Sequence, residues 1–228
     1  MLEHCLAALA AQVRPADEII VVDNGSTDDS AEVARRFGAT VVPEPRAGIW
    51  AAAARGFDEA DGDILARCDA DSRPGETWLQ RIESLLLANP DAVALSGPGR
   101  FYDLVAPLRV IADVLYMRAY FAGARLWLGN RTVFGSNFAM PASTWEALGD
   151  EVHRDDPEVH DDLDLSFHLS PARRVRFVRR LRMGISMRPL FDGAAFARRF
   201  HRGVHTVRIH WPHDLPWLRW VRRAVEPN

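Results

Sequence analysis

Residues 18–29 read EIIVVDNGSTDD. The apolar and β-branched run at the start of this stretch predicts a buried strand that ends at Asp23, because such side chains favour strands and fill a sheet's interior. Asn24 and Gly25 predict a turn after the strand, and the serine, threonine and aspartates that follow are typical of a helix start. A strand that passes through a short turn into a helix is the repeating unit of sheets covered by helices.

The same unit recurs through the first half of the chain. Further strands are predicted at 39–42, 63–67 and 92–96. Helices are predicted at 49–60 and 76–88, and an earlier helix is predicted to follow a cap at Ser26 or Thr27, run through Arg36 and stop at Gly38. This alternation predicts an α/β fold with a Rossmann-like, mostly parallel sheet that is flanked by helices. The second half is less regular, and its predicted helices are 110–128, 141–148, 161–169 and 194–205. No linker or internal repeat divides the chain.

A pair of carboxylates follows one of these strands. Asp69 and Asp71 stand one residue apart where the run from Ile64 enters a loop, and such sheets bind ligands at the carboxyl ends of their strands. Carboxylate oxygens suit Mg²⁺ or Mn²⁺, and Mg²⁺ is commonly held by one or two carboxylates together with substrate phosphates. A calcium loop is excluded, because Arg73 and Pro74 occupy positions that need an acid and a glycine. Loop solvation or helix capping is the alternative for this pair.

Composition limits the class of protein. With 228 residues, 48% of them hydrophobic, the chain can fold as one sizeable domain. Its two cysteines, Cys5 and Cys68, form no disulfide framework and are expected to be reduced. The apolar segment from Leu104 to Leu128 is interrupted by charged residues, so a bilayer span is not expected, and the chain lacks the pattern of a signal peptide.

Charge is distributed unevenly along the chain. Residues 172–228 carry many arginines and only three acidic residues, whereas the rest of the chain is acidic. A basic segment of this kind could face phosphates, an anionic membrane surface or nucleic acid, or fold back on the acidic body. The net charge of −3 counts against nucleic acid as a partner. Zinc is not predicted in this segment, because arginines separate its histidines, which are His201, His205, His210 and His213.

With these motifs in order, the chain resembles the family 2 glycosyltransferases, which have the GT-A fold. The matching pieces are VDNGSTD at 22–28, DAD at 69–71, GSNFA at 135–139 and DDLDLS at 161–166. Their order and separations agree with that family from about residue 2 to residue 170.

On the donor side, the resemblance implies a role for four residues. Asp23 and Asn24 lie where the family contacts the nucleotide base. Asp69 lies where the family contacts the ribose and the metal, and Asp71 where it binds the metal that bridges the diphosphate. Mg²⁺ or Mn²⁺ is the implied cofactor, and a nucleotide-diphosphate sugar, with a UDP-sugar as the leading candidate, is the implied donor.

On the acceptor side, the resemblance implies that Asp162 is the general base and that Asp161 is the first acid of the same catalytic pair. Gly135, Ser136 and Asn137 lie on the acceptor side of the family's site. The acceptor would be a saccharide, a lipid-linked intermediate or a small molecule. Arg199 or Arg202 is a candidate to neutralise the departing phosphates.

The resemblance therefore implies an inverting, metal-dependent glycosyltransferase with one continuous GT-A domain. Residues 1–98 would be its nucleotide-sugar-binding half, and residues 99–228 its acceptor-binding half with the arginine-rich segment. A cytoplasmic location is expected, with peripheral contact at the cytoplasmic membrane face as an open alternative.

One departure from the family bears on function. The family opens with a Val/Ile-rich strand and an Asn-Glu loop, whereas this chain starts at a segment that matches the helix after that loop. The absent strand is an interior one, so its neighbours should present unpaired edges. A non-catalytic remnant that binds a sugar-nucleotide or a partner is therefore the alternative function. Nucleotidyl transfer is disfavoured, because no glycine-rich loop with basic residues lies near the N-terminus.

Overall fold

The computed structural model describes residues 1–129, 131–169, 174–188, 193–211 and 214–225, without the side chains of 194–196 and 223–225. Helices and strands alternate through the first 96 residues, which confirms the α/β prediction. These elements are α1 (Leu2–Ala10), β1 (Ile20–Asp23), α2 (Ser30–Arg36), β2 (Thr40–Pro43), α3 (Ile49–Glu59), β3 (Ile64–Arg67), β4 (Arg73–Pro74), α4 (Trp78–Leu87) and β5 (Ala92–Ser96).

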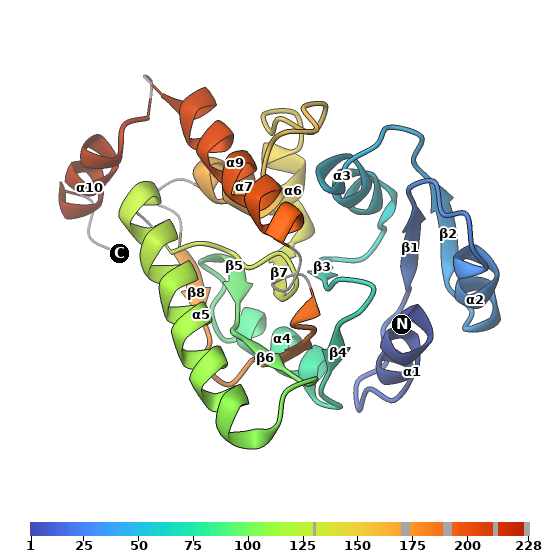
Figure 1. Cartoon of the computed structure of the whole chain (residues 1–228). Coiled ribbons are helices and arrows are strands. Elements are labelled where there is room, and N and C mark those ends of the chain that lie inside the picture. Colours follow the sequence, from blue (N-terminus) through green and yellow to red (C-terminus); the bar gives the residue numbers. More distant parts are fainter. Residues whose placement is uncertain (130, 170–173, 189–192, 212–213, 226–228) are drawn as a thin grey trace.

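The second half adds helices over one side of the molecule and, within the described residues, four strands to its sheets (Figure 1). Its long helix begins four residues earlier than predicted, because a proline in the first turn needs no hydrogen-bond partner there. The elements are β6 (Gly99–Phe101), α5 (Ala106–Leu128), β7 (Phe138–Pro141), α6 (Ala142–Leu148), α7 (Asp161–His168), β8 (Arg174–Phe177), β9 (Met183–Ile185), α9 (Gly193–His210) and α10 (Pro216–Val225).

The central sheet has the strand order β3-β7-β5-β8. β5 and β8 are parallel, and β7 lies between β3 and β5 antiparallel to both. β1 and β2 form a separate parallel pair, and β4-β9-β6 a small third sheet. Residue 139 pairs with residue 66 on β3 and with residue 95 on β5, so β7 joins the two halves of the chain.

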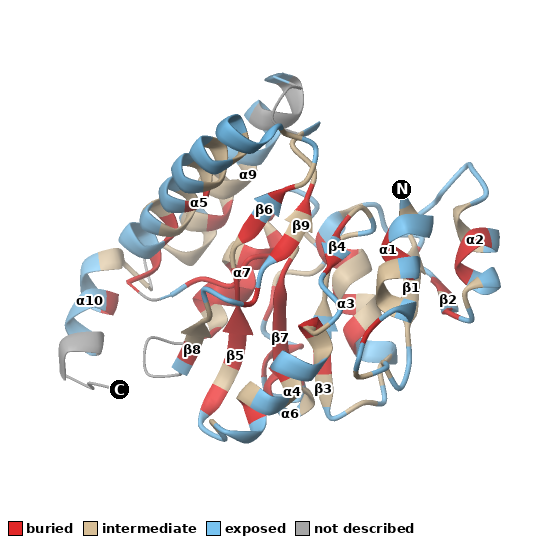
Figure 2. Ribbon diagram, turned by 90° about the horizontal axis from the view of Figure 1, so that it is seen from below, coloured by how far each residue is buried: buried red, intermediate tan, exposed pale blue. Residues whose placement is uncertain are grey.

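The core packs on both faces of the central sheet, and Figure 2 shows buried residues concentrated on β5 and β7. On one face, Trp50 and Phe57 of α3 pack against Trp145 of α6 with ring centroids 5.9 and 5.0 Å apart. On the other face, Trp78 and Ile82 of α4 lie in a second apolar cluster. The sheet is therefore held between two apolar layers, which fixes the strand ends that carry the acidic residues.

A slot separates β1 from β3. The two strands lie in different sheets, and a cavity of about 840 Å³ is lined by residues 19–22 of one and 64–66 of the other. Its walls are mostly apolar, with Leu6 and Leu9 of α1 and Phe57 of α3 among them. Within the described residues, β1 pairs only with β2 and β3 only with β7, so each strand has one unpaired edge.

No helix within the described ranges is long and apolar enough to cross a bilayer. Most of the apolar segment from Leu104 to Leu128 forms α5, which lies along the outside of the second half (Figure 1).

Candidate active site

The acidic pair lies in a tight loop directly after β3. The Ser72 hydroxyl accepts a hydrogen bond from the Asp69 amide at 3.2 Å, and the Ser72 amide donates to the Asp69 carbonyl at 2.9 Å. The loop then enters β4, which pairs with β9. This closed turn holds the Asp69 and Asp71 carboxylates at the carboxyl edge of the central sheet.

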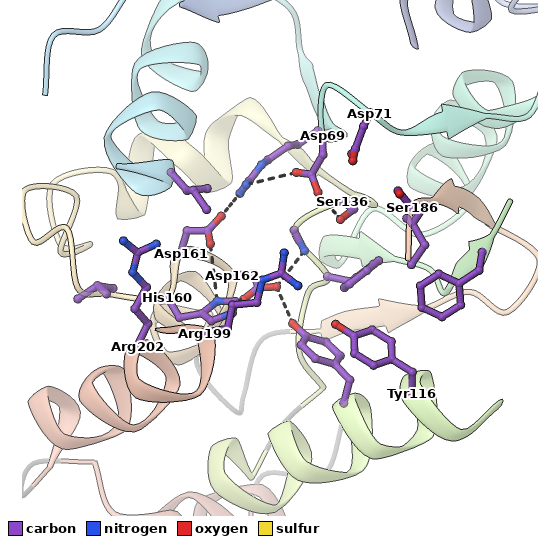
Figure 3. A pocket seen from close by; sticks show the side chains of 18 residues that line it. Asp69, Asp71, Tyr116, Ser136, His160, Asp161, Asp162, Ser186, Arg199 and Arg202 are labelled. Atoms are coloured by element: carbon purple, nitrogen blue, oxygen red, sulfur yellow. Dashed lines mark hydrogen bonds and ion pairs between the residues drawn. The ribbon is translucent and has the colours of Figure 1, made fainter. Parts of the chain in front are cut away.

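Four predicted aspartates converge on one cavity of about 160 Å³ (Figure 3). Asp69 and Asp71 reach it from the loop after β3, and Asp161 and Asp162 from the first turn of α7. Residues from both halves of the chain complete its wall, among them Gly135, Ser136, Tyr116, Tyr120, Arg199 and Arg202. Sequence positions more than 90 residues apart thus meet at one site.

Arg67 links the two acidic pairs. Its Nη1 lies 2.5 Å from Asp161 Oδ2, and its Nη2 lies 3.9 Å from Asp69 Oδ1. Burial acts to lower the pKa of Arg67, but Asp161 and Asp69 outweigh burial and raise this pKa. Burial also raises the pKa of Asp69, against the opposing effects of Arg67 and of the Ser136 hydroxyl. A cationic side chain between the two pairs of carboxylates offsets the repulsion between their negative charges, so the two pairs can lie close together.

Asp162 is buried and has three partners. Its Oδ2 accepts the Tyr120 hydroxyl at 2.6 Å and the Gly135 amide at 3.0 Å, and its Oδ1 lies 2.5 Å from His160 Nδ1. Burial acts to raise the pKa of Asp162, but His160, Tyr120 and the Gly135 amide lower it to about 2. Burial acts to lower the pKa of His160, but Asp162 raises it to about 9. At neutral pH the two side chains form an ion pair.

The three residues predicted on the acceptor side do not share one role. Gly135 and Ser136 line the cavity, and the Ser136 hydroxyl donates to Asp69 Oδ2 at 2.5 Å. Asn137 is fully buried and does not line it. Its amide group accepts from Trp78 Nε1 at 2.9 Å and donates to the Leu181 carbonyl at 2.7 Å. The Asn137 side chain therefore links α4 to the segment before β9 within the core. It does not line the cavity in which an acceptor contact was predicted for it.

Of the two residues predicted to contact the base, only Asn24 lines the slot. The Asn24 side chain ties the end of β1 to the carbonyls of Glu44 and Arg46, both at 2.7 Å. Asp23 lines neither cavity, and its Oδ1 accepts the Ser26 amide at 2.8 Å. The slot and the acidic cavity share Arg67, Asp69, Ile49 and Arg202 in their walls, so the two spaces adjoin.

Sequence reasoning missed several polar residues of the cavity region, among them Arg67, Tyr120, His160 and Arg188. The structure brings Arg188 Nη2 to 3.8 Å from Asp71 Oδ2. Arg67 left a signal, because a charged residue ends a strand whose other members are apolar. His160 directly precedes the acidic run, but a single histidine forms no pattern in the sequence from which its contact with Asp162 could be predicted. Arg199 and Arg202, the candidates to neutralise the departing phosphates, both lie in the cavity wall.

Comparison with known proteins gives a family match. The family model described as glycosyl transferase family 2 matches residues 1–142. Glycosyltransferase AglE of Haloferax volcanii is 35% identical over 88 residues, which cover 35% of this chain and 29% of AglE. Probable glycosyltransferase YdaM of Bacillus subtilis is 26% identical over 240 residues, which cover 99% of this chain and 53% of YdaM. The alignments thus cover about a third to a half of these relatives' lengths.

Solved structures share the fold. The mannosyltransferase PcManGT from Pyrobaculum calidifontis, in complex with GDP-Man and Mn²⁺, has a TM-score of 0.60 at 20% identity, covering 99% of this chain and 69% of that one. Glucosyl-3-phosphoglycerate synthase from Mycobacterium tuberculosis, in complex with Mn²⁺ and UDP-Glc, also has a TM-score of 0.60 at 20% identity, covering 90% and 74%. The likeness confirms the GT-A fold. The family model spans more than half of the chain, and the protein therefore belongs to glycosyltransferase family 2.

Proposed function

We propose that this protein transfers a sugar from a nucleotide-diphosphate sugar to an acceptor hydroxyl, with inversion at the anomeric carbon. The observation that supports the proposal most is the convergence of Asp69, Asp71, Asp161 and Asp162 on one cavity. Carboxylates on one side suit a cation and a diphosphate, and a buried carboxylate on the other suits proton transfer.

The residues of the acidic pair fit a divalent cation. Within the described residues, the Asp71 carboxylate makes only the 3.8 Å contact with Arg188 and no hydrogen bond, so its oxygens are available. The donor set consists of carboxylate oxygens, which favours Mg²⁺ or Mn²⁺ over softer metals. Asp71 and Asp69 would hold the ion, which would stabilise the charge of the diphosphate leaving group when bound.

The donor would extend from the cavity into the slot. A cavity of about 160 Å³ is small beside the roughly 300–1,000 Å³ of typical ligand pockets. The adjoining slot supplies the remaining space, and Asn24 lies in its wall. We therefore place the diphosphate near Asp69, Asp71 and the two arginines of α9, Arg199 and Arg202. The nucleoside would lie on the slot side, near Asp23 and Asn24. A UDP-sugar is the first donor to test, since UDP-Glc is bound in one of the structural neighbours.

Asp162 would act as the general base. The acceptor oxygen forms its bond to the anomeric carbon as the bond from that carbon to the diphosphate breaks, and the hydroxyl proton passes to Asp162. Because Tyr120 and His160 occupy the carboxylate, the acceptor hydroxyl must displace one of them. A pKa of about 2 makes Asp162 a weak base, so the proton moves late, after the attacking oxygen has become acidic. Asp161, paired with Arg67, would position the first turn of α7.

The acceptor would approach from the second half of the chain. Tyr116 and Phe134 line the cavity on that side, beside Gly135 and Ser136. This arrangement supports residues 1–98 as the donor half and residues 99–228 as the acceptor half. A saccharide, a lipid-linked intermediate and a small molecule all present the required hydroxyl.

The decisive experiment measures release of nucleoside diphosphate from a panel of UDP-, GDP- and TDP-sugars with Mn²⁺. Asp71→Asn should abolish metal-dependent release while the protein keeps its fold, as judged by circular dichroism. Asp17→Asn is the matched control, because Asp17 is an exposed acid in a surface ion pair. Unchanged release by the folded Asp71→Asn variant would remove the acidic pair from the mechanism.

The slot supports a second candidate, a sugar-nucleotide-binding protein without transfer activity. Unpaired edges of β1 and β3 border the nucleoside side of the site, so the base could bind there in a geometry unsuited to transfer. Thermal-shift titration separates the two functions. Stabilisation by a donor with no turnover, even with acceptor mixtures present, would favour the binding protein over the enzyme.

Peripheral membrane contact is a further part of the proposal. α5 exposes Leu108, Ile111 and Leu115, which share one face of the helix, and α10 exposes Trp217 and Trp220. Exposed apolar and aromatic side chains next to arginines are typical of helices that lie in a membrane interface. Sedimentation with anionic vesicles should capture the protein, and the Trp217→Ser/Trp220→Ser variant should stay in the supernatant.

A further inference from the structure

A second cluster of metal-ligating side chains lies away from the acidic cavity, around Asp164 of α7. Asp164 Oδ1 lies 2.8 Å from His153 Nδ1, 2.9 Å from His210 Nε2 and 3.7 Å from His168 Nε2. One ligand atom from each of the four residues falls within 4.8 Å of every other. None of the four lines the acidic cavity. Asp162 and Asp164 are two positions apart, so they point to different sides of α7.

Hydrogen bonding to the aspartate explains only part of this cluster. Asp164 Oδ2 already accepts Trp50 Nε1 at 2.7 Å and the His153 amide at 2.9 Å. Two imidazoles then suffice to satisfy Oδ1, yet three face it. His168 Nε2 is buried and makes no hydrogen bond within the described part of the chain. A buried polar atom without a partner needs an explanation, and an absent ion is a common one.

The three rings are also packed closely against one another. Their centroids lie 5.1–5.5 Å apart, and His210 stacks on Phe167 at 4.1 Å. Three imidazolium ions so close together would repel each other. The arrangement suits neutral rings that share one cation more than it suits three charged rings.

The donor set and its surroundings resemble those of a closed zinc site. Three imidazole nitrogens and one carboxylate oxygen fill four positions, which is the coordination number of structural Zn²⁺. Asp164 and His168 stand at positions i and i+4 of α7, a spacing that places two ligands on one helix face. The Trp50 indole and the His153 amide orient the carboxylate from behind, as outer partners of metal ligands do. His153, whose side chain is 39% exposed, leaves an entry path from solvent.

We propose that His153, Asp164, His168 and His210 form a structural zinc site that fastens α9 to α7. The ligands come from the loop before α7, from α7 itself and from the end of α9. α9 is the helix that brings Arg199 and Arg202 to the wall of the acidic cavity. The ion would therefore fix the position of these arginines. The site stands on its own geometry and does not depend on the proposed transfer reaction.

Metal analysis of untagged protein, purified without chelators, tests the proposal. We expect one zinc per chain by mass spectrometry, and its loss in both His168→Asn and His210→Asn. His205→Asn is the matched control, because His205 lies on the same helix but pairs with Asp156 outside the cluster. Asp71→Asn should also retain zinc, which separates this site from the acidic cavity. Equal zinc content in His210→Asn and His205→Asn, or none in the wild type, would overturn the proposal.

Two measurements on the wild type do not depend on the folding of a variant. Zinc at 100 times its dissociation constant should raise the melting temperature of metal-free protein by roughly 5–10 °C. Titration with Co²⁺ should produce, at one equivalent, the intense visible absorption of a four-coordinate ion. An unchanged melting temperature, or only the pale spectrum of six-coordinate cobalt, would mean that Asp164 is a hydrogen-bonded core aspartate and nothing more.

Discussion

Replacing Arg67 by methionine removes the cation that joins the two acidic pairs while it keeps most of the volume of the side chain. Arg67 is 12% exposed and Asp161 is 9% exposed, and their charged atoms lie 2.5 Å apart. Breaking such a buried pair leaves an uncompensated carboxylate and costs about 3–5 kcal/mol. For a chain of this length, each kcal/mol lowers the melting temperature by about 2–4 °C, so the expected loss is roughly 6–20 °C.

Urea unfolding at pH 7, followed by circular dichroism, measures the loss of unfolding free energy. Arg14→Met is the control, because Arg14 forms its ion pairs with exposed partners and its loss should leave the unfolding free energy nearly unchanged. Adding Asp161→Asn to Arg67→Met should restore part of the stability, since the unpaired charge is then removed. A loss below about 1 kcal/mol for Arg67→Met, with no coupling to Asp161→Asn, would refute the assigned role of Arg67.

Three further outcomes are expected. Tyr120→Phe should lower the unfolding free energy by about 1.5–3 kcal/mol in urea, because its hydroxyl donates to the ionised Asp162; a change under 0.5 kcal/mol would contradict this. The pKa of His160 is raised to about 9, so its ion pair contributes fully below pH 6.5 and is lost as pH rises through 9. Stability should thus fall by up to about 3 kcal/mol over that range, and His160→Gln should flatten the profile. Gly97→Ala should cost about 3 kcal/mol or more, because a Cβ would lie 1.8 Å from a backbone carbonyl oxygen; Gly123→Ala, with open space around it, is the thermal-melting control.

The fold was predictable from the sequence where its signals are local. Strands β1, β2, β3 and β5 are apolar runs that end in turn residues, and all four form within a residue or two of their predicted bounds. The direction of β7 was not predictable, because the pairing partners of its residue 139 lie 44 and 73 residues earlier, at residues 95 and 66. The helix predicted to follow a cap at Ser26 or Thr27 begins only at Ser30, since Asp23 holds the preceding turn through the Ser26 amide.

The candidate site divides in the same way. The motif at 69–71 and the acidic run at 161–162 were predictable as site residues, and both reach one cavity. The first follows the end of an apolar strand and the second starts a helix, and both signals are local in the sequence. Asn137 shows the limit of this reasoning. It follows Gly135 and Ser136 directly in the sequence, yet it ends the turn before β7 with its side chain in the core. Which side of the backbone a loop residue faces depends on packing partners that lie far away in the chain.

The histidine cluster could not be read from the sequence at all. In the sequence, His210 stands near His201 and His205, and only this local spacing is visible. In the structure its partners are His153 and His168, which lie 57 and 42 residues earlier. Of the four candidate ligands, only Asp164 and His168 show a helical spacing, and that spacing is as common for a surface ion pair.

The most direct test of the account is to locate Mn²⁺ by anomalous diffraction in crystals grown with UDP. We expect an ion in contact with the Asp71 carboxylate and the diphosphate, inside the cavity that Asp69, Asp161 and Asp162 line. The uridine should extend into the slot beside β1. An ion bound elsewhere, or a nucleotide seated away from Asp71 without metal, would contradict it.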